Sequence, residues 1–178
     1  LRDADCLVKV VRAFDNPGVP PRKGSIDPRR DLEEINSDLF IVDLDILERR
    51  IERLQVNVKK PTPRQEAEKV ELALLERARV QLEAHGALDR LDVTDEERKA
   101  LNCFQFLTQK PGVLVANVGE GQIGDASALA ALGERREPML AIAAAIEKEL
   151  SDLDPAERGP FLEDLGLVGA GGHGVLDA

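Results

Sequence analysis

The chain has 178 residues, enough for one domain with its own core or for a domain that carries an insertion. Its 34 acidic and 24 basic side chains give a net charge of −10, which excludes a broad basic nucleic-acid-binding surface. Cys6 and Cys103 have no CxxC or His-spaced partner, which argues against a zinc site or a disulfide framework. No apolar run approaches the roughly 20 residues that span a membrane. We therefore expect a soluble, cytoplasmic protein with two buried thiols.

The first predicted element is a strand. The mostly apolar, β-branched run 6–14 is typical of a buried parallel strand rather than of an alternating surface strand. A loop rich in Pro and Gly follows over 16–24. Asp27 and Pro28 then form a helix start, with Asp at the N-cap and Pro at the first helical position.

A long amphipathic helix is predicted after Pro28. Its apolar residues recur at steps of three to five: Leu32, Ile35, Leu39, Val42, Ile46, Ile51, Leu54 and Val58. The segment 59–63 ends this helix, and a second periodic segment follows with Ala67, Val70, Leu74, Ala78 and Leu82. Because two helices joined by a short turn pack antiparallel, we expect a helical hairpin or coiled coil. Its charged faces are typical of solvated helix surface.

The second half of the chain resumes an α/β pattern. Thr94 to Glu97 form a capping box, 113–117 reads as a strand, and 126–132 reads as a helix. The run 138–144 is predicted as a strand, although its alanines also suit a helix. Further helices are predicted from Ile146 and Pro155. The order predicts a parallel α/β sheet with a helical insertion, in which residues 1–27 and 93–178 form the α/β domain and residues 28–92 form the hairpin.

The segment Asn117-Val118-Gly119-Glu120 ends the predicted strand 113–117. In open α/β sheets, ligands bind beyond the carboxyl ends of the strands. An asparagine, exposed backbone groups and a carboxylate suit the edge of a purine base. The sequence therefore predicts a base-binding site here.

A competing motif overlaps this one. Residues 119–124 satisfy G-x-G-x-x-G between a predicted strand and a predicted helix, as a dinucleotide-binding oxidoreductase would. Such a fold normally places the motif in its first βα unit and ends the next strand in an acidic residue, whereas this strand ends in Ala143-Ala144.

A third hypothesis is a non-catalytic interaction module that uses the hairpin as a docking arm. His85 and His173 lack the partners of a catalytic triad, and no G-x-x-x-x-G-K-[ST] occurs.

Several runs together resemble the YchF-type Obg-like ATPases, which are P-loop NTPases. The resemblance covers nearly the whole chain and rests on Leu1-Arg2-Asp3-Ala4-Asp5, Arg12-Ala13-Phe14, Gly24-Ser25-Ile26-Asp27-Pro28, Leu107-Thr108-Gln109-Lys110-Pro111, Val115-Ala116-Asn117-Val118-Gly119-Glu120 and Phe161-Leu162-Glu163-Asp164-Leu165-Gly166-Leu167. It implies a P-loop NTPase-type α/β domain with an inserted antiparallel hairpin.

The resemblance also implies how a base would be selected. In that family Asn-x-x-Glu replaces the Asn-Lys-x-Asp of related GTPases, which shifts preference from guanine to adenine. Asn117 would bond the purine edge, the backbone of Val118 would bind the adenine amino group, and Glu120 would stand in place of the aspartate that binds guanine. A second base-side loop usually contains Ser-Ala, and the aligned pair here is Ala143-Ala144, which lacks the hydroxyl.

For the complete protein, the resemblance implies a monomeric ATPase that uses ATP and Mg²⁺ and binds ribosomes through the large subunit. The phosphate loop and the magnesium ligands would lie upstream of Leu1, and a small β-rich domain would follow Ala178. We therefore expect this chain to be a central piece of a longer protein. No catalytic residue and no metal ligand is expected within it, so it would be inactive alone.

Overall fold

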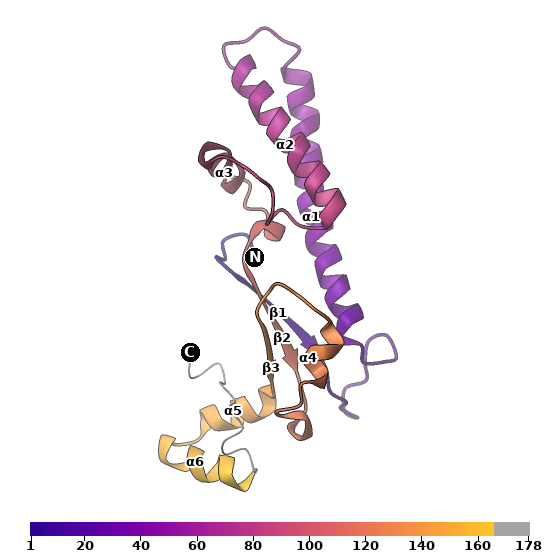
Figure 1. Cartoon of the computed structure of the whole chain (residues 1–178), viewed down its shortest axis with the longest axis vertical. Helices are drawn as coiled ribbons and strands as arrows, with labels where there is room; N and C mark the ends of the chain where they lie inside the picture. The colour runs from indigo at the N-terminus through magenta and orange to yellow at the C-terminus, as the bar shows by residue number, and fades with distance from the viewer. Residues whose placement is uncertain (166–178) are drawn as a thin grey trace. The chain divides into compact units, whose positions relative to one another are not determined.

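The computed structural model describes residues 1–165, which form both helices and strands (Figure 1). The elements in chain order are β1 (Leu7–Arg12), α1 (Pro28–Asn57), α2 (Gln65–His85), α3 (Asp95–Asn102), η1 (Leu107–Gln109), β2 (Gly112–Asn117), η2 (Glu120–Gln122), α4 (Ser127–Leu132), β3 (Met139–Ile142), α5 (Ala144–Asp152) and α6 (Pro155–Asp164). No helix among these is long and apolar enough to cross a membrane. Leu167, at the end of the last family-like run, and His173 lie outside the described residues.

The three strands form one parallel sheet in the order β1-β2-β3. Leu114 lies opposite Met139 and Asn117 lies opposite Ile142, so β2 and β3 run in the same direction. The backbone N–H of Leu7 donates to Pro111, and that of Ala13 donates to Asn117, so β1 runs the same way. The predicted α/β class with a parallel sheet is confirmed, and all three carboxyl ends lie at one edge.

The first strand differs from its prediction. Leu7 and Val11 are buried, whereas Val8 and Val10 are exposed, so β1 alternates as an edge strand does rather than being buried on both faces. Cys6 is exposed, and so is Cys103, which follows the last residue of α3. The expectation of two buried thiols was therefore wrong. Cys6 lies one residue before the buried Leu7. Because successive side chains of a strand point to opposite faces, Cys6 lies on the face opposite to Leu7, which is exposed.

The chain divides into two compact units. Unit 1 consists of residues 1–7 and 33–111, which include most of α1, all of α2 and α3, and η1. Unit 2 consists of residues 8–32 and the chain from Gly112 onward, which include nearly all of the sheet and helices α4 to α6.

In unit 1, α1 and α2 are antiparallel. Asn57 bonds Glu68, while Arg50, earlier on α1, forms a bidentate ion pair with Glu71, later on α2, with both N···O distances at 2.7 Å. The hydrogen bonds to Glu71 raise the pKa of the Arg50 guanidinium. The apolar core between the helices extends to the segments that follow α2 and consists of Leu47, Ile51, Leu54, Leu74, Leu75, Ala78, Leu82, Leu88, Leu101 and Phe106.

The core of the hairpin follows the predicted stripes only in part. Val42 and Val70 were expected on the apolar faces, yet they are 39% and 66% exposed. Leu47 and Leu75, which those stripes did not include, are fully buried. On α1 the buried residues Asp43, Leu47, Ile51 and Leu54 recur at steps of four, four and three, and Val42 lies one residue, or about 100° around the helix, away from this buried face.

Asp43 is a buried acidic residue on α1. Its side chain is 0% exposed, and its two carboxylate oxygens accept hydrogen bonds from the backbone N–H groups of Leu107 and Thr108 at 3.0 and 2.7 Å. These are first-turn donors of η1, which have no partner within the turn itself. Asp43 therefore fixes η1 against the long helix.

The predicted capping box at the start of α3 is confirmed. The Thr94 hydroxyl accepts from the backbone N–H of Glu97 at 3.2 Å, and the Glu97 carboxylate accepts from the backbone N–H of Thr94 at 2.9 Å. Glu97 also pairs with Arg77 of α2 at 2.6 Å. The hydrogen bond from the Thr94 backbone, followed by the bond from Arg77, lowers the pKa of Glu97.

Candidate functional site

The predicted base-binding segment lies at the carboxyl edge of the sheet, in unit 2. Asn117 is the last residue of the central strand. Its backbone carbonyl accepts from Ala13, beyond the end of β1, at 2.7 Å, and the N–H of Val118 donates to Ile142 of β3 at 2.8 Å. The segment is therefore held on both sides by strands that are distant in sequence.

The side chain of Asn117 is fixed by a hydrogen bond from α5. Its Oδ1 accepts from the backbone N–H of Ala144 at 3.1 Å. Because the partner is a donor, the oxygen of the amide must face it, and the Nδ2 group retains two donors for another partner. The side chain is half-buried. Asn117 thus presents hydrogen-bond donors at an edge where ligands of α/β sheets bind.

Ala143 and Ala144 form the junction between β3 and α5. Ala143 is buried, whereas Ala144 is exposed and is the first residue of the helix. Ala143 stands at the N-cap position without a side chain that could accept from the first turn. Asn117, from a different strand, supplies the acceptor instead. The structure therefore brings together Asn117, Val118 and the Ala143-Ala144 pair.

Gln122 joins the end of β2 to the end of β1, and sequence analysis did not identify it. Its Oε1 accepts from the N–H of Gly119 at 2.9 Å, and its Nε2 donates to the carbonyl of Ala13 at 3.2 Å. A Cβ atom on Gly119 would lie 3.4 Å from the Cβ of Phe14 and from Oε1 of Gln122, in van der Waals contact with both. Glu120 begins the short η2 helix and is exposed.

A cation lies at the same edge of the sheet. Arg12 donates from Nε to the carbonyl of Phe14 at 2.9 Å and from Nη1 to the carbonyl of Val19 at 2.7 Å. Its guanidinium lies 5.2 Å from the centre of the Phe14 ring, within the range of a cation–π interaction. Its Nη2 atom is buried without a hydrogen-bond partner in the described residues. This arrangement orders the loop after β1 and holds a positive charge in a defined place.

The glycine motif 119–124 does not have the geometry of a dinucleotide fingerprint. That fingerprint needs a helix whose N-terminus opens directly at the glycines, so that the dipole faces the pyrophosphate. Here η2 follows Gly119, Gly124 has a positive φ of 80°, and α4 begins only at Ser127. The motif is a turn between β2 and α4.

Other features of the described residues contribute little to this site. Within 1–165, no cluster of three or more His, Cys, Asp and Glu side chains could hold a metal ion. A hollow of about 490 Å³ lies in unit 1, lined by residues from 2–5, 88–102 and 105–111, and it includes none of the predicted base-binding residues. Gln105, in its wall, has a left-handed φ of 52°.

Comparison with known proteins identifies the family. The chain matches no protein-family model. It is 35% identical over its whole length to the ribosome-binding ATPase YchF of Escherichia coli O157:H7, and 30% identical over 96% of its length to that of Bacillus subtilis. It covers 49% and 48% of those proteins, so it spans about half the length of the curated relatives it matches.

The fold agrees with these sequence matches. The structure of the YchF GTPase of Schizosaccharomyces pombe superimposes with a TM-score of 0.79 over 93% of this chain and 47% of that one. At 24% identity this likeness concerns the fold alone. The full-length matches to the curated relatives and the shared fold together show that the chain belongs to the YchF-type Obg-like family.

Proposed function

We propose that the complete protein binds and hydrolyses ATP and associates with ribosomes, and that this chain carries its adenine-selecting edge. The relatives it matches over its full length are named ribosome-binding ATPases. From the family resemblance of the sequence we further propose that the complete protein is a cytoplasmic monomer and that it contacts the large ribosomal subunit. No G-x-x-x-x-G-K-[ST] phosphate loop occurs in this sequence, so hydrolysis is assigned to no residue of this chain, and we propose that other parts of the complete protein hold the phosphates and Mg²⁺.

The observation that carries the proposal is the hydrogen bond from Ala144 to Asn117 Oδ1. It directs the amide so that Nδ2 is left to donate. Both purines carry an acceptor at N7, and asparagine is a common partner of that atom. We assign Asn117 to the N7 edge of the base, where it recognises a purine without distinguishing adenine from guanine.

Selection of adenine is assigned to the backbone of Val118. Its N–H is already bonded to Ile142, so the carbonyl is the group left for a base. A carbonyl accepts from the 6-amino group of adenine and repels the O6 atom of guanine. The exposed Glu120 is assigned no bond to the base, so guanine would lose the acceptor that an aspartate offers its N1 and N2 donors. Ala143 and Ala144 would form the opposite wall of the pocket.

The test is calorimetric titration of the complete protein with ATP, GTP and NAD in the presence of Mg²⁺. ATP should bind more tightly than GTP, and NAD should bind least. Tighter binding of NAD than of ATP would contradict the proposal and favour the oxidoreductase hypothesis. Binding of none of the three would leave the hairpin as the functional part and favour the interaction module.

Two substitutions separate the ligand role of Asn117 from its structural role. Asn117→Asp keeps an acceptor for Ala144 but removes the Nδ2 donors, whereas Asn117→Ala removes both. Each should weaken ATP binding by about 1–3 kcal/mol, because a polar group of the base is left without its partner. Asn102→Asp, at an exposed position in unit 1, is the matched control and should leave the affinity unchanged. Unchanged affinity in both Asn117 variants would remove this residue from the site.

A further inference from the structure

The hollow of about 490 Å³ in unit 1 has an apolar floor. Leu88, Leu101 and Phe106 line it, and they are 3%, 1% and 1% exposed. All three belong to the hydrophobic core of unit 1, so the floor continues that core. The volume lies within the roughly 300–1,000 Å³ of pockets that bind small organic molecules. The hollow therefore has room for a ligand with an apolar body.

Charged side chains of both signs line the same hollow. Three are cations and three are anions: Arg2, Arg98, Lys110, Asp3, Asp5 and Asp89. Among residues 1–165, none of these six side chains makes a hydrogen bond or an ion pair. Opposite charges elsewhere in unit 1 do pair, as Arg50 and Glu71 do at 2.7 Å. The hollow therefore keeps three positive and three negative groups available to a ligand.

The floor of the hollow is ordered by its own neighbours. Gln105, in the wall, is the one non-glycine residue with a positive φ in the described part of the chain, at 52°. This conformation is costly for a residue with a side chain and persists only where the surrounding structure fixes it. Gln105 separates Phe104 from Phe106, whose rings stack with their centroids 5.4 Å apart. Because Phe106 is already held in place, binding would cost less conformational entropy.

We propose that this hollow binds a small zwitterion with an apolar side chain, as in a free amino acid or a short peptide. The carboxylates of Asp3, Asp5 and Asp89 hold the ammonium group, and the three cations hold the carboxylate through charge-assisted hydrogen bonds. The floor buries the apolar side chain of the ligand. The hollow lies in unit 1 and the predicted base-binding residues lie in unit 2, so this inference does not depend on the proposed function.

A phosphate-bearing ligand is the weaker match to this hollow. The charges of the six lining residues sum to zero, and a phosphate drawn to the cations would also meet three carboxylates. Sites that attract anions concentrate one sign of charge instead. A zwitterion carries one group for each set of side chains. Inorganic phosphate therefore serves as the competing ligand in the test.

The experiment titrates the ¹⁵N-labelled full chain with small ligands and follows its amide signals by nuclear magnetic resonance. The probes are leucine, the dipeptide Leu-Leu and inorganic phosphate. Leu-Leu should shift the signals of residues that line the hollow, such as Leu101 and Gln105, along a saturable curve. Its doubly blocked form, with an acetylated N-terminus and an amidated C-terminus, should bind about tenfold more weakly or worse, because it keeps the side chains but lacks both charges.

Two variants match the charges of the ligand to the two sets of side chains. The combined variant Arg98→Gln and Lys110→Gln should bind Leu-Leu about tenfold more weakly and should discriminate less against its C-terminal amide. The combined variant Asp3→Asn and Asp5→Asn should discriminate less against the N-acetylated dipeptide instead. A purely structural role of these residues would weaken the binding of all forms of the ligand alike, and that result would overturn the proposal.

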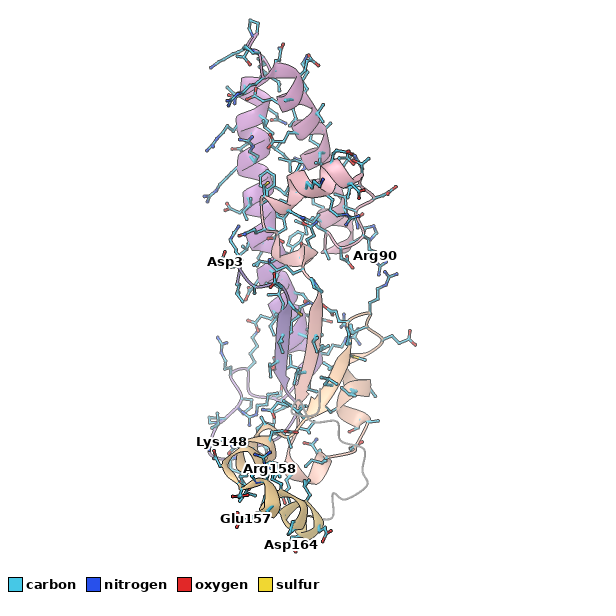
Figure 2. All side chains as sticks on the ribbon, turned by 90° about the vertical axis from the view of Figure 1, so that its left-hand side faces the viewer. Asp3, Arg90, Lys148, Glu157, Arg158 and Asp164 are labelled. Carbon is cyan, nitrogen blue, oxygen red and sulfur yellow. The ribbon has the colours of Figure 1, made fainter. Side chains whose placement is uncertain are left out.

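A matched control removes the same charge nearby. Arg90→Gln with Lys99→Gln changes two exposed basic residues of unit 1 that do not line the hollow. Figure 2 shows Arg90 and Asp3 on opposite sides of unit 1. This variant should bind Leu-Leu like the wild type. An equal loss in the control and in the variant of Arg98 and Lys110 would overturn the proposal, because net charge alone would then explain binding.

Results with the unaltered chain decide the proposal even if a variant fails to fold. The absence of any saturable change with leucine and with Leu-Leu would overturn it, and so would tighter binding of phosphate than of Leu-Leu. Equal affinity for Leu-Leu and its doubly blocked form would also overturn it, because the hollow would then be an apolar surface only. Saturable binding with a preference for the charged form supports the proposal, and the tighter of leucine and Leu-Leu identifies the ligand as an amino acid or a peptide.

Discussion

The hairpin of unit 1 and the strand edge of unit 2 are held together by different forces. The hairpin buries a continuous set of leucines between two long helices, and its stability comes mainly from apolar burial. The strand edge depends on single hydrogen bonds between short segments, such as those made by Asn117 and Gln122. The hairpin should therefore tolerate polar substitutions on its surface, whereas removal of one hydrogen-bond donor or acceptor should change the geometry of the strand edge.

The largest effect is expected from truncating the hairpin core. Leu75 is 0% exposed, and Leu75→Ala should destabilise the chain by about 2–5 kcal/mol through lost burial and the cavity left behind. Urea unfolding of the full chain measures this. Val80→Ala, on the same helix but 60% exposed, should change stability by less than about 0.5 kcal/mol. Similar losses in both variants would show that the hairpin is not held by this core.

Asp43 tests whether the hairpin also depends on a polar anchor. Asp43→Ala leaves the N–H groups of Leu107 and Thr108 without their acceptor, and each orphaned group costs about 1–3 kcal/mol, so a loss of roughly 3 kcal/mol is expected. Thermal or urea unfolding measures the difference. Asp45→Ala, two residues away with an exposed ion pair to Arg49, should cost about 0.5 kcal/mol or less. Equal effects at the two positions would rule out the anchor role.

Gln122 tests the strand edge without touching the proposed base contacts. Gln122→Ala removes both bonds that tie Gly119 to Ala13, so the base-binding segment should become less ordered. We expect ATP affinity of the complete protein to fall by about 1 kcal/mol, roughly fivefold, with little loss of global stability. Calorimetric titration and urea unfolding provide the two measurements. A large loss of stability with no change in affinity would make Gln122 a purely structural residue.

The smallest effect concerns the charge on Glu97. Its pKa lies below the ordinary value of 4.5, chiefly because of the hydrogen bond from the Thr94 backbone. A lowered folded-state pKa adds stability that is present above the unfolded-state pKa and is lost as the pH falls through the folded-state pKa. Glu97→Gln should therefore be slightly less stable than the wild type at pH 7, and the two should converge in acid.

Stability curves at several pH values test this prediction. Glu96→Gln, at the adjacent exposed position, serves as the control and should show no such convergence. A difference between Glu97→Gln and the wild type that stayed constant from neutral to acid pH would mean that the charge of Glu97 has no role in the cap.

The local sequence pattern was sufficient to predict many of the helices and strands. The hairpin helices, the capping box at Thr94, the strand before Asn117 and the helix beginning at Pro155 were all predicted from spacing and from helix-end residues. Such features depend on neighbours within about four residues, which the sequence displays directly. The position of Asn117 at a strand end also followed from local pattern, although its role as a base ligand stays a prediction.

Tertiary structure decided the rest. Asn117 meets Ala144 across 27 residues, Asp43 meets Thr108 across 65, and Gln122 meets Ala13 across 109. No periodicity records such pairs, because each is a single hydrogen bond between segments that only the sheet or the hairpin brings together. The exposure of Cys6 and Val42 was likewise set by which face of a strand or helix the core covers. The sequence by itself determined the elements and the order of their apolar residues, whereas packing alone determined which polar groups that are distant in sequence meet.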